Sequence, residues 1–446
     1  MRDRNYSAQD VLKMVKEKDV KFIKFWFVDI LGQVKSFAVT PDELPTALED
    51  GMGFDGSSIE GFARIFESDL IGKPDPSTFT ILPWRPGESA VVGRMFCDVL
   101  TPDGKPYDGC PRNILKKNLE KMKKAGFDAF NVGPELEYFY FKNNHTPEVM
   151  DEGGYFDLMP LDLGHDLRRD TILALQEMGI PVEYSHHEVA PGQHEIDLRY
   201  GPALEMADDV ITYKATVKAI AMQGNAYASF MPKPIAGVNG SGMHTHMSLF
   251  NKDKNAFYKK GEPYHLSPEA RHFMAGVLKH SAEICAITNQ WVNSYKRLIP
   301  GYEAPVYIVW GQKNRSALVR VPMYKPGQEK ATRIELRFPD PACNPYLAFS
   351  VMLAAGLEGI KNKYTLKDAS EIDMFKLSPE EMKEKGIETL PGSLIEAIHV
   401  AEKSDFLRSA LGEHVFEKFM ENKKIEWDRY RTQVSNYELN AYLPIL

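Results

Sequence analysis

Paired carboxylates on segments with the pattern of β-strands are the feature that most constrains how this chain can fold. The segment GPELEYF (133–139) has the pattern of a buried strand, yet Glu135 and Glu137 stand two residues apart among apolar and aromatic neighbours. Side chains two apart on a strand point to the same face. Buried carboxylates have to be solvated, protonated or bound to a cation. The fold must therefore meet one of these conditions for both side chains.

A second pair of carboxylates flanks a predicted hairpin in VEYSHHEVAPGQHEIDLRY (182–200). With a two-residue loop at Pro191 and Gly192, Glu188 lies directly opposite Glu195. Pro-Gly is not a favoured hairpin turn, but a diagonal register would still leave the two carboxylates close together. Opposed like charges destabilise a sheet, and a bound cation would remove the conflict.

Two further segments extend the pattern. TRIELRF (332–338) alternates a charged face with an apolar face, and GMHTHMSLF (242–250) places His244 and His246 on one face of a strand. A single charged strand usually faces solvent, and a lone pair of histidines is more often structural than a ligand set. Taken together, five carboxylates and one imidazole suffice for two oxygen-rich sites with about three ligands each, the chemistry of Mg²⁺ or Mn²⁺.

Basic side chains recur beside these segments, namely Arg297, Arg315, Arg320, Lys330, Arg333 and Arg337. Guanidinium groups bind carboxylate or phosphate through two hydrogen bonds and stabilise charge on a transferring phosphoryl group. For any single arginine, a surface ion pair is an equally good interpretation. The chain contains no GxxxxGK[ST] P-loop, and NGSGMH does not complete GxGxxG after a strand. The residues therefore predict a divalent-metal phosphoryl-transfer enzyme of another fold.

Composition limits the class of protein. The 446 residues, 43% of them hydrophobic, are enough for a large core and for more than one domain. The net charge of −8 and the lack of a long basic block argue against nucleic-acid and membrane partners. The polar start has no secretory pattern, and the four cysteines are scattered without a CxxC motif. We therefore expect a soluble, cytoplasmic protein.

The chain divides near TPDGKPYDGCP (101–111), which is rich in Pro, Gly and Asp. Before it, a helix capped by Ser7, two strands around the turn LGQ and a short helix from Pro41 predict a small α+β domain. Beyond it, strand-like segments and long helical patterns predict a mixed sheet backed by helices. The longest helical patterns cover residues 111–126, 203–227, 267–290 and 344–363.

Seven motifs give the chain a specific resemblance to bacterial and archaeal type I glutamine synthetases, in order and in approximate spacing. They are FDGSSIEGF (54–62), GPELEYF, HHEVAPGQHEIDLRY, NGSGMHTHMS (239–248), NSYKRLIPGYEAP (293–305), NRSALVR (314–320) and RIELRFPD (333–340). The resemblance covers essentially the whole chain and implies an α+β fold. Residues 1–105 would form a β-grasp-like N-terminal domain. Residues 106–446 would form the catalytic domain, with a curved, mainly antiparallel sheet backed by helices.

The same resemblance implies roles for individual residues. Glu137, Glu188 and Glu195 would hold a metal next to glutamate, and Glu135, His244 and Glu335 would hold the metal that orients ATP. ATP would be contacted by Glu183, His246, Ser248, Arg320, Lys330 and Arg333, and glutamate by Asn239, Gly240 and Arg297. Arg315 and Arg337 would brace the transferred phosphoryl group, and Asp55 would take a proton from ammonium. Glu303 would lie on a loop that closes over the site.

The implied reaction joins ammonia to L-glutamate with ATP. The γ-carboxylate would first take the γ-phosphoryl group to give γ-glutamyl phosphate, and ammonia would then displace phosphate to give glutamine. A γ-glutamyl ligase for a small organic amine would share the metal and ATP motifs but lack the Asp55 pocket. A guanidino kinase would have no use for the separate domain that carries FDGSS. An inactive structural relative is expected to have lost metal ligands, and all six are present.

Regulation and assembly are also implied by resemblance. Phe375 stands where relatives controlled by adenylylation carry a tyrosine, and Arg64 is associated with feedback inhibition by glutamine, so the I-alpha subgroup is favoured. We expect two or more Mg²⁺ or Mn²⁺ ions per site, and a nitrogen-regulatory protein is a candidate partner. The expected assembly is a homo-dodecamer of two stacked six-membered rings with active sites between subunits. The apolar tail YELNAYLPIL (437–446) would join the rings.

Overall fold

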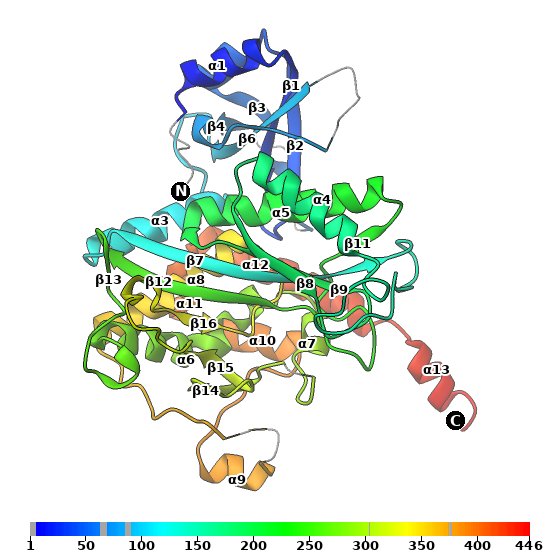
Figure 1. Cartoon of the computed structure of the whole chain (residues 1–446), viewed down its shortest axis with the longest axis vertical. Helices are drawn as coiled ribbons and strands as arrows, with labels where there is room; N and C mark the ends of the chain where they lie inside the picture. The colour runs from blue at the N-terminus through cyan, green and yellow to red at the C-terminus, as the bar shows by residue number, and fades with distance from the viewer. Residues whose placement is uncertain (1–5, 63–68, 85–90, 303, 373, 375–376) are drawn as a thin grey trace.

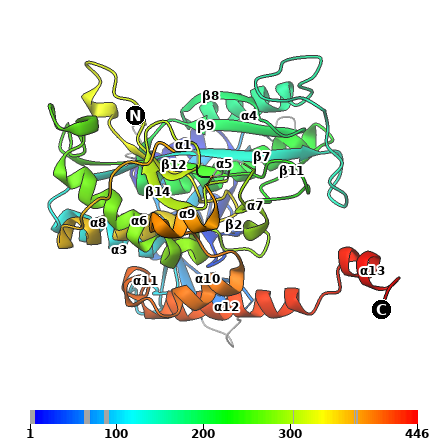
Figure 2. The ribbon, with the colours of Figure 1, turned by 90° about the horizontal axis from the view of Figure 1, so that it is seen from below.

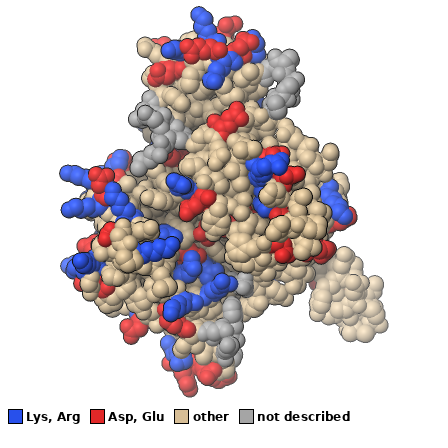
Figure 3. Space-filling view, viewed as in Figure 1, with Lys and Arg blue, Asp and Glu red and all other residues tan. Residues whose placement is uncertain are grey.

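The computed structural model describes residues 6–62, 69–84, 91–302, 304–372, 374 and 377–446. Three residues singled out in the sequence, Arg64, Glu303 and Phe375, lie outside this described part. Among the described residues, no helix combines the length and apolar character that crossing a membrane requires. Charged side chains of both signs are interspersed over the face drawn in Figure 3.

The N-terminal part is a small sheet with helices packed on it, at the top of Figure 1. The strand order is β2-β1-β6-β4-β3, and β5 pairs with β6. β1 and β6 are parallel, whereas the other pairs are antiparallel. The bounds are α1 (Ala8–Glu17), β1 (Val20–Val28), β2 (Val34–Val39), α2 (Leu44–Asp50), β3 (Met52–Asp55), β4 (Asp69–Pro74), β5 (Thr80–Ile81) and β6 (Val91–Leu100).

Local sequence accounts for these elements. Ser7 caps α1 in a capping box with Asp10, as predicted. The predicted strands around LGQ form the β1–β2 hairpin, in which Ile23 pairs with Val39. The second helix, α2, begins at Leu44 and not at Pro41, because Pro41 opens a turn that precedes it. Val11 and Val15 of α1 are buried in the core that this sheet forms.

The larger part is built on a ten-stranded sheet with the order β14-β15-β16-β12-β7-β9-β8. Only β14 and β15 are parallel, so the predicted mainly antiparallel sheet is confirmed. Short strands β10, β11 and β13 attach to β7 and β12. The bounds are β7 (Ala129–Phe141), β8 (Val182–His187), β9 (Gln193–Leu198), β10 (Gly201–Pro202), β11 (Tyr227–Ser229), β12 (Met243–Asn251), β13 (Lys254–Asn255), β14 (Tyr307–Gly311), β15 (Ala317–Arg320) and β16 (Ile334–Leu336).

Helices cover this sheet, and the four long ones that the sequence predicted are confirmed as α3 (Pro111–Lys124), α5 (Ala203–Gln223), α6 (Pro268–Thr288) and α8 (Pro345–Asn362). α3 and α5 pack on β7, α6 packs on β14 and β15, and the mostly buried α8 packs against α3, α5 and α6. The remaining helices are α4 (His165–Glu177), α7 (Ser294–Arg297), α9 (Pro379–Glu384), α10 (Leu394–Ala401), α11 (Asp405–Leu411), α12 (Glu413–Arg431) and α13 (Asn436–Tyr442). α13 projects from the body of the molecule (Figures 1 and 2).

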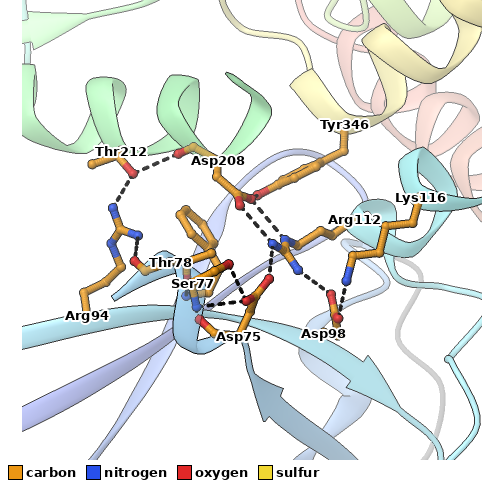
Figure 4. A network of polar contacts seen from close by, with 11 residues as sticks. Asp75, Ser77, Thr78, Arg94, Asp98, Arg112, Lys116, Asp208, Thr212 and Tyr346 are labelled. Atoms are coloured by element: carbon orange, nitrogen blue, oxygen red, sulfur yellow. Dashed lines mark hydrogen bonds and ion pairs between the residues drawn. The ribbon is translucent and has the colours of Figure 1, made fainter. Parts of the chain in front are cut away.

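A buried network of charges joins the two sheets (Figure 4). The Arg112 guanidinium at the start of α3 donates to both Asp208 carboxylate oxygens on α5, at 3.1 and 3.0 Å. It also pairs with Asp98 on β6 at 2.5 Å and with Asp75, between β4 and β5, at 2.8 Å. The Tyr346 hydroxyl of α8 donates to Asp208. The Arg112 guanidinium of α3 therefore connects the small sheet to α5, and Asp208 extends the network to α8.

The prediction of a two-residue loop at Pro191 and Gly192 is wrong. β8 ends at His187 and β9 begins at Gln193, so Glu188 lies in a longer connection and not opposite Glu195. Glu195 pairs with His186 instead. Pro-Gly does not form the primed turns that close two-residue hairpins. Gly192 instead takes a φ of 65° close to Val149, a conformation that favours glycine.

Candidate active site

A cavity of about 290 Å³ lies where β7, β12, β16 and the β8–β9 hairpin meet. Its lining is mainly polar. The lining includes twelve residues that the sequence singled out, namely Glu135, Glu137, Glu188, Glu195, Asn239, Gly240, His244, Arg297, Arg315, Arg320, Glu335 and Arg337. The tertiary structure thus gathers segments that are 200 residues apart in the chain into one site.

One group of candidate metal ligands consists of Glu135, His244 and Glu335, whose ligand atoms all lie within 4.8 Å of one another. Adjacent strands supply them, since His244 on β12 stands opposite Glu135 on β7. The Nδ1 atom of His244 lies 3.5 Å from Glu135 Oε2 and 3.8 Å from Glu335 Oε1. The predicted set of three therefore comes together in space.

The second group consists of His186, Glu188 and Glu195, also within 4.8 Å. His186 was not among the predicted site residues, although it immediately precedes the second histidine of the HHE motif. Glu137, which was predicted as the third ligand, stands opposite Glu195 on the neighbouring strand. Its Oε2 atom accepts hydrogen bonds from Gln193 Nε2 at 3.0 Å and from the Gly242 N–H at 2.9 Å.

The carboxylates of this second group repel one another in a buried place. Burial, with the nearby Glu188 charge, raises the pKa of Glu137 to about 8. Burial, with Asp197 and Glu137, raises the pKa of Glu195 well above its ordinary value. Asp197 lies two residues beyond Glu195 on β9, opposite Glu135, and its pKa is raised to about 7, mainly by burial. A divalent cation would offset this repulsion, so the donor set fits an oxygen-preferring metal.

The first group already has positive partners. Burial raises the pKa of Glu135, but hydrogen bonds from His244 and His246 outweigh burial and hold this pKa well below its ordinary value. For Glu335, burial is likewise outweighed by His246, His244, Arg337 and Arg320. Arg320 is hydrogen-bonded to Glu335, and Arg337 Nε lies 3.3 Å from it. These arginines place positive charge beside the carboxylates that face the cavity.

Arg297 is held in place by backbone carbonyls. Its NH1 atom donates to Phe338 O at 2.7 Å, its NH2 atom donates to Arg337 O at 3.2 Å, and the side chain is buried. Gly242 packs against it so closely that a Cβ there would lie 2.5 Å from Arg297 NH2. This close approach requires glycine at position 242, which is within the NGSGMH motif.

Other predicted ATP residues lie beside the cavity and not on its lining. His246 Nε2 is 2.7 Å from Glu135 Oε1, and Arg333 Nε donates to His246 Nδ1 at 3.2 Å. Because β16 includes only Ile334–Leu336, Arg333 and Arg337 flank that strand and do not continue it. Glu183 and Lys330 are exposed, and Ser248 is buried on β12.

Asp55 is not brought to the cavity within one chain. It ends β3 in the N-terminal sheet and caps the turn that follows, where its Oδ1 atom accepts a hydrogen bond from the Ser57 N–H at 2.9 Å. Every described residue on the cavity lining belongs to the larger part, from Glu135 onward. The side chain of Asp55 is exposed.

A third group, Asp151, Asp162, His187 and His194, is fully buried and was not predicted. Arg168 already occupies this group, since it forms an ion pair with Asp162 at 2.6 Å and its NH1 atom lies 2.8 Å from His194 Nδ1. A guanidinium among the ligands repels a metal ion. We therefore assign this group to the structure that supports the site.

The fold and the cavity define a class of protein in which two neighbouring groups of candidate metal ligands lie beside a cluster of arginines. Comparison with known protein families then shows which family this chain belongs to. Residues 19–102 match the glutamine synthetase β-grasp domain, and residues 108–442 match the glutamine synthetase catalytic domain. The predicted β-grasp domain and catalytic sheet are thereby confirmed. The chain belongs to the glutamine synthetase family and is an ATP-dependent enzyme of glutamine synthesis.

Individual relatives match the sequence of this chain over nearly its full length. The chain is 54% identical over 444 residues to a glutamine synthetase of Methanosarcina mazei, with 99% of this chain and 98% of the relative covered. It is 49% identical to one of Thermotoga maritima, with 98% and 99% covered. Among solved structures, a GmaS/ADP complex matches with 31% identity and a TM-score of 0.88, covering 98% of this chain and 99% of that one.

Proposed function

We propose that glutamine synthesis by this chain takes place in the cavity at β7, β12 and the β8–β9 hairpin, in two steps. Glutamate first takes the γ-phosphoryl group of ATP on its γ-carboxylate, which gives γ-glutamyl phosphate. Ammonia then attacks the activated carbonyl carbon, and phosphate leaves. The observation that carries this proposal is that two sets of candidate metal ligands and a cluster of arginines lie in one cavity.

The residues of the two groups are proposed to hold Mg²⁺ or Mn²⁺. Glu135, His244 and Glu335 would hold one ion, and Glu137, Glu188 and Glu195 the other, with His186 beside them. Bound divalent ions neutralise phosphate charge and polarise the oxygens of the transferred group. The raised pKa values of Glu137 and Glu195 support this role, because a cation favours the ionised carboxylates.

Arg297, Asn239 and Gly240 are proposed to bind glutamate. The Arg297 guanidinium is suited to the α-carboxylate because backbone carbonyls fix its orientation before substrate arrives. A Cβ at position 240 would lie 2.3 Å from Pro232 O and 3.1 Å from Arg297 Cγ, so glycine there lets the backbone pack closely against the Arg297 side chain. Both residues and Asn239 line the cavity.

ATP is proposed to lie along β12 and β16, where it would contact His246, Ser248, Arg320, Arg333 and, farther out, Glu183 and Lys330. Contacts that run from Glu135 through His246 to Arg333 support this placement of ATP, since they lead outward from the proposed metal ligand Glu135. The description of the GmaS relative as an ADP complex is consistent with a nucleotide in this fold. Arg315 and Arg337 would stabilise the transferred phosphoryl group.

The second step needs ammonia and not ammonium, so a base has to take one proton. We propose Asp55 of a neighbouring copy for this role, and Glu303 for closing the site over γ-glutamyl phosphate, where it keeps water out. The exposed position of Asp55 in the N-terminal sheet supports a role outside its own chain.

One assay tests this function against the ligation of organic amines. Purified protein is given ATP, glutamate and a divalent metal, with ammonium, hydroxylamine or a polyamine as the acceptor, and phosphate and the amide product are measured. We expect turnover with ammonium and with hydroxylamine, and none with polyamines. Turnover with polyamines alone would overturn the ammonia assignment. The curated relatives named glutamine synthetase favour ammonia.

The proposed assembly is a cytoplasmic homo-dodecamer of two six-membered rings. The C-terminal segment projects from the body and is mostly uncharged in Figure 3, with Leu443 and Ile445 about three-quarters exposed. A cavity of about 640 Å³ lined by Phe230, Trp291 and Tyr430 could receive such a segment from the opposite ring. The burial of all four free cysteines agrees with a reducing compartment.

Regulation is proposed to follow the I-alpha subgroup, with Arg64 taking part in feedback inhibition by glutamine and a nitrogen-regulatory protein as a further partner. Replacing Arg64 by alanine is expected to weaken inhibition by added glutamine and to leave turnover without glutamine nearly unchanged. Inhibition curves at increasing glutamine measure this. An unchanged curve would remove Arg64 from the regulatory site.

A further inference from the structure

Behind the β8–β9 hairpin lies a buried polar network that no step of the reaction uses. Along a strand, faces alternate, so His187 and His194 point away from the cavity that His186 and Glu195 line. His187 and His194 pair across the hairpin, are fully buried, and their rings meet edge to face with centroids 4.7 Å apart. Each of them immediately precedes a proposed metal ligand in the chain, Glu188 or Glu195.

A single carboxylate, Asp151, holds both ends of the connection between the two strands. Its Oδ1 atom is 2.9 Å from His187 Nε2 and accepts the Gly192 N–H at 3.0 Å. Its Oδ2 atom accepts the Leu163 N–H at 2.9 Å, which ties the segment before α4 to the same point. His187 Nδ1 is in turn 2.7 Å from the Glu188 carbonyl oxygen. The backbone of Glu188 is therefore fixed by a contact that begins at Asp151.

Both ring nitrogens of His187 are held by oxygen atoms, since Nε2 lies 2.9 Å from the Asp151 carboxylate and Nδ1 lies 2.7 Å from the Glu188 carbonyl. These contacts are buried, with His187 inaccessible and Asp151 only 6% exposed. Breaking them leaves buried polar groups without partners, so they resist any displacement of the connection.

We infer that Asp151 and His187 are positioning residues for the cation that Glu188 and Glu195 hold. The inference rests on the proposed metal-binding role of the hairpin and adds the means by which Glu188, which lies outside the strand ladder, keeps its place. Residues that orient metal ligands without touching the metal commonly contribute about 10- to 100-fold in metal affinity. The other group, Glu135, His244 and Glu335, has no contact with this network among the described residues.

The test is the binding of Mn²⁺ to the full-length protein without substrates, followed by calorimetry and by electron paramagnetic resonance. Asp151→Asn keeps the size of the side chain but turns one oxygen that accepts a backbone N–H into a donor. We expect one of two Mn²⁺ binding phases to weaken about tenfold or more and the other to stay within twofold. His187→Gln, which loses the donor to the Glu188 carbonyl, is expected to affect the same phase.

Asp208→Asn is the matched control. Asp208 is buried like Asp151 and accepts hydrogen bonds from Arg112, but it joins α5 to α3 and not the two strands of the hairpin. It is expected to lower thermal stability and leave both Mn²⁺ phases unchanged. A general effect of losing a buried carboxylate would instead appear in both variants.

The outcomes separate the inference from the proposed function. If the wild-type protein binds no Mn²⁺, both the metal assignment and the inference fail. If wild type binds two ions, and both Asp151→Asn and His187→Gln bind them within twofold of wild type, only the inference fails. Should Asp151→Asn not fold, His187→Gln decides alone. If neither variant folds while Asp208→Asn does, the network is needed for folding and the positioning role is rejected.

Discussion

At the scale of single residues, the two carboxylates of the GPELEYF segment have opposite environments. Glu135 and Glu137 share one strand face, yet histidines hold the pKa of Glu135 low, whereas burial beside Glu188 raises the pKa of Glu137 to about 8. Identical residue types two positions apart thus meet the conditions for a buried carboxylate in different ways. Glu135 accepts hydrogen bonds from His244 and His246, whereas Glu137 lies in a place where a bound cation would stabilise its ionised form.

Glu137 makes stability depend on pH when metal is absent. Between an ordinary pKa of 4.5 and the folded value of about 8, the folded protein holds a proton that the unfolded chain has released. The free energy of unfolding therefore falls as pH rises through this window and levels off above it. Thermal unfolding in EDTA at pH 6, 7 and 8 should show this decline, and added Mn²⁺ should stabilise most at pH 8. Glu137→Gln is expected to flatten the decline, and an equally steep decline in that variant would contradict the assignment.

At the scale of elements, α3 links the two sheets through its first residues. Arg112, at 4% exposure, reaches carboxylates on β6, α5 and the segment after β4 because the helix begins where it does. Pro111 at the first helical position sets that start. The position of the N-terminal sheet, and with it the Asp55 turn, therefore depends on a few side chains at one helix end.

Arg112→Leu is predicted to destabilise the protein by about 3–5 kcal/mol, because it leaves the buried Asp208 carboxylate without its cation. The double variant Arg112→Leu with Asp208→Leu should recover part of this loss, since the most deeply buried of the unpaired carboxylates is also removed. Urea unfolding midpoints of wild type, both single variants and the double variant measure the coupling. If the double variant is no more stable than Arg112→Leu, the loss is not caused by the unpaired carboxylate.

At the scale of the whole molecule, the residues proposed to take part in the reaction are divided between two regions. The two groups of candidate metal ligands lie on and beside the large sheet, whereas Asp55 belongs to the small one and does not line the cavity. A second copy can supply what one chain lacks, which is the case in which an oligomer is needed for activity and not only for stability.

Mixed assemblies test this division. Asp55→Ala and Glu335→Ala chains, each expected to be nearly inactive, are co-expressed with different affinity tags and purified through both tags. If Asp55 acts in the neighbouring site, about a quarter of the interfaces in a random ring combine two intact partners, so activity should return to about that share. Doubly tagged assemblies no more active than either parent would show that Asp55 acts within its own chain or not at all.

Much of this architecture follows from local sequence. The capping box at Ser7, the helical repeat of residues 345–362 and the alternation in GPELEYF depend on side chains within a few positions of one another. Such patterns act whatever the rest of the chain does, so they predicted the element types. The charged strand faces likewise predicted that carboxylates and histidines would gather, because side-chain alternation along a strand is a property of the backbone.

Tertiary structure decided what depends on distant partners. The length of the β8–β9 connection, the pairing of His186 with Glu195 and the opposite pKa values of Glu135 and Glu137 are set by the strands that happen to be neighbours. The support of Glu188 by Asp151 joins residues that are separated by a whole helix and strand. Sequence alone determined which residues are charged, apolar or able to turn. Register, burial and electrostatic environment are properties of contacts between segments, and those contacts exist only once the chain has folded.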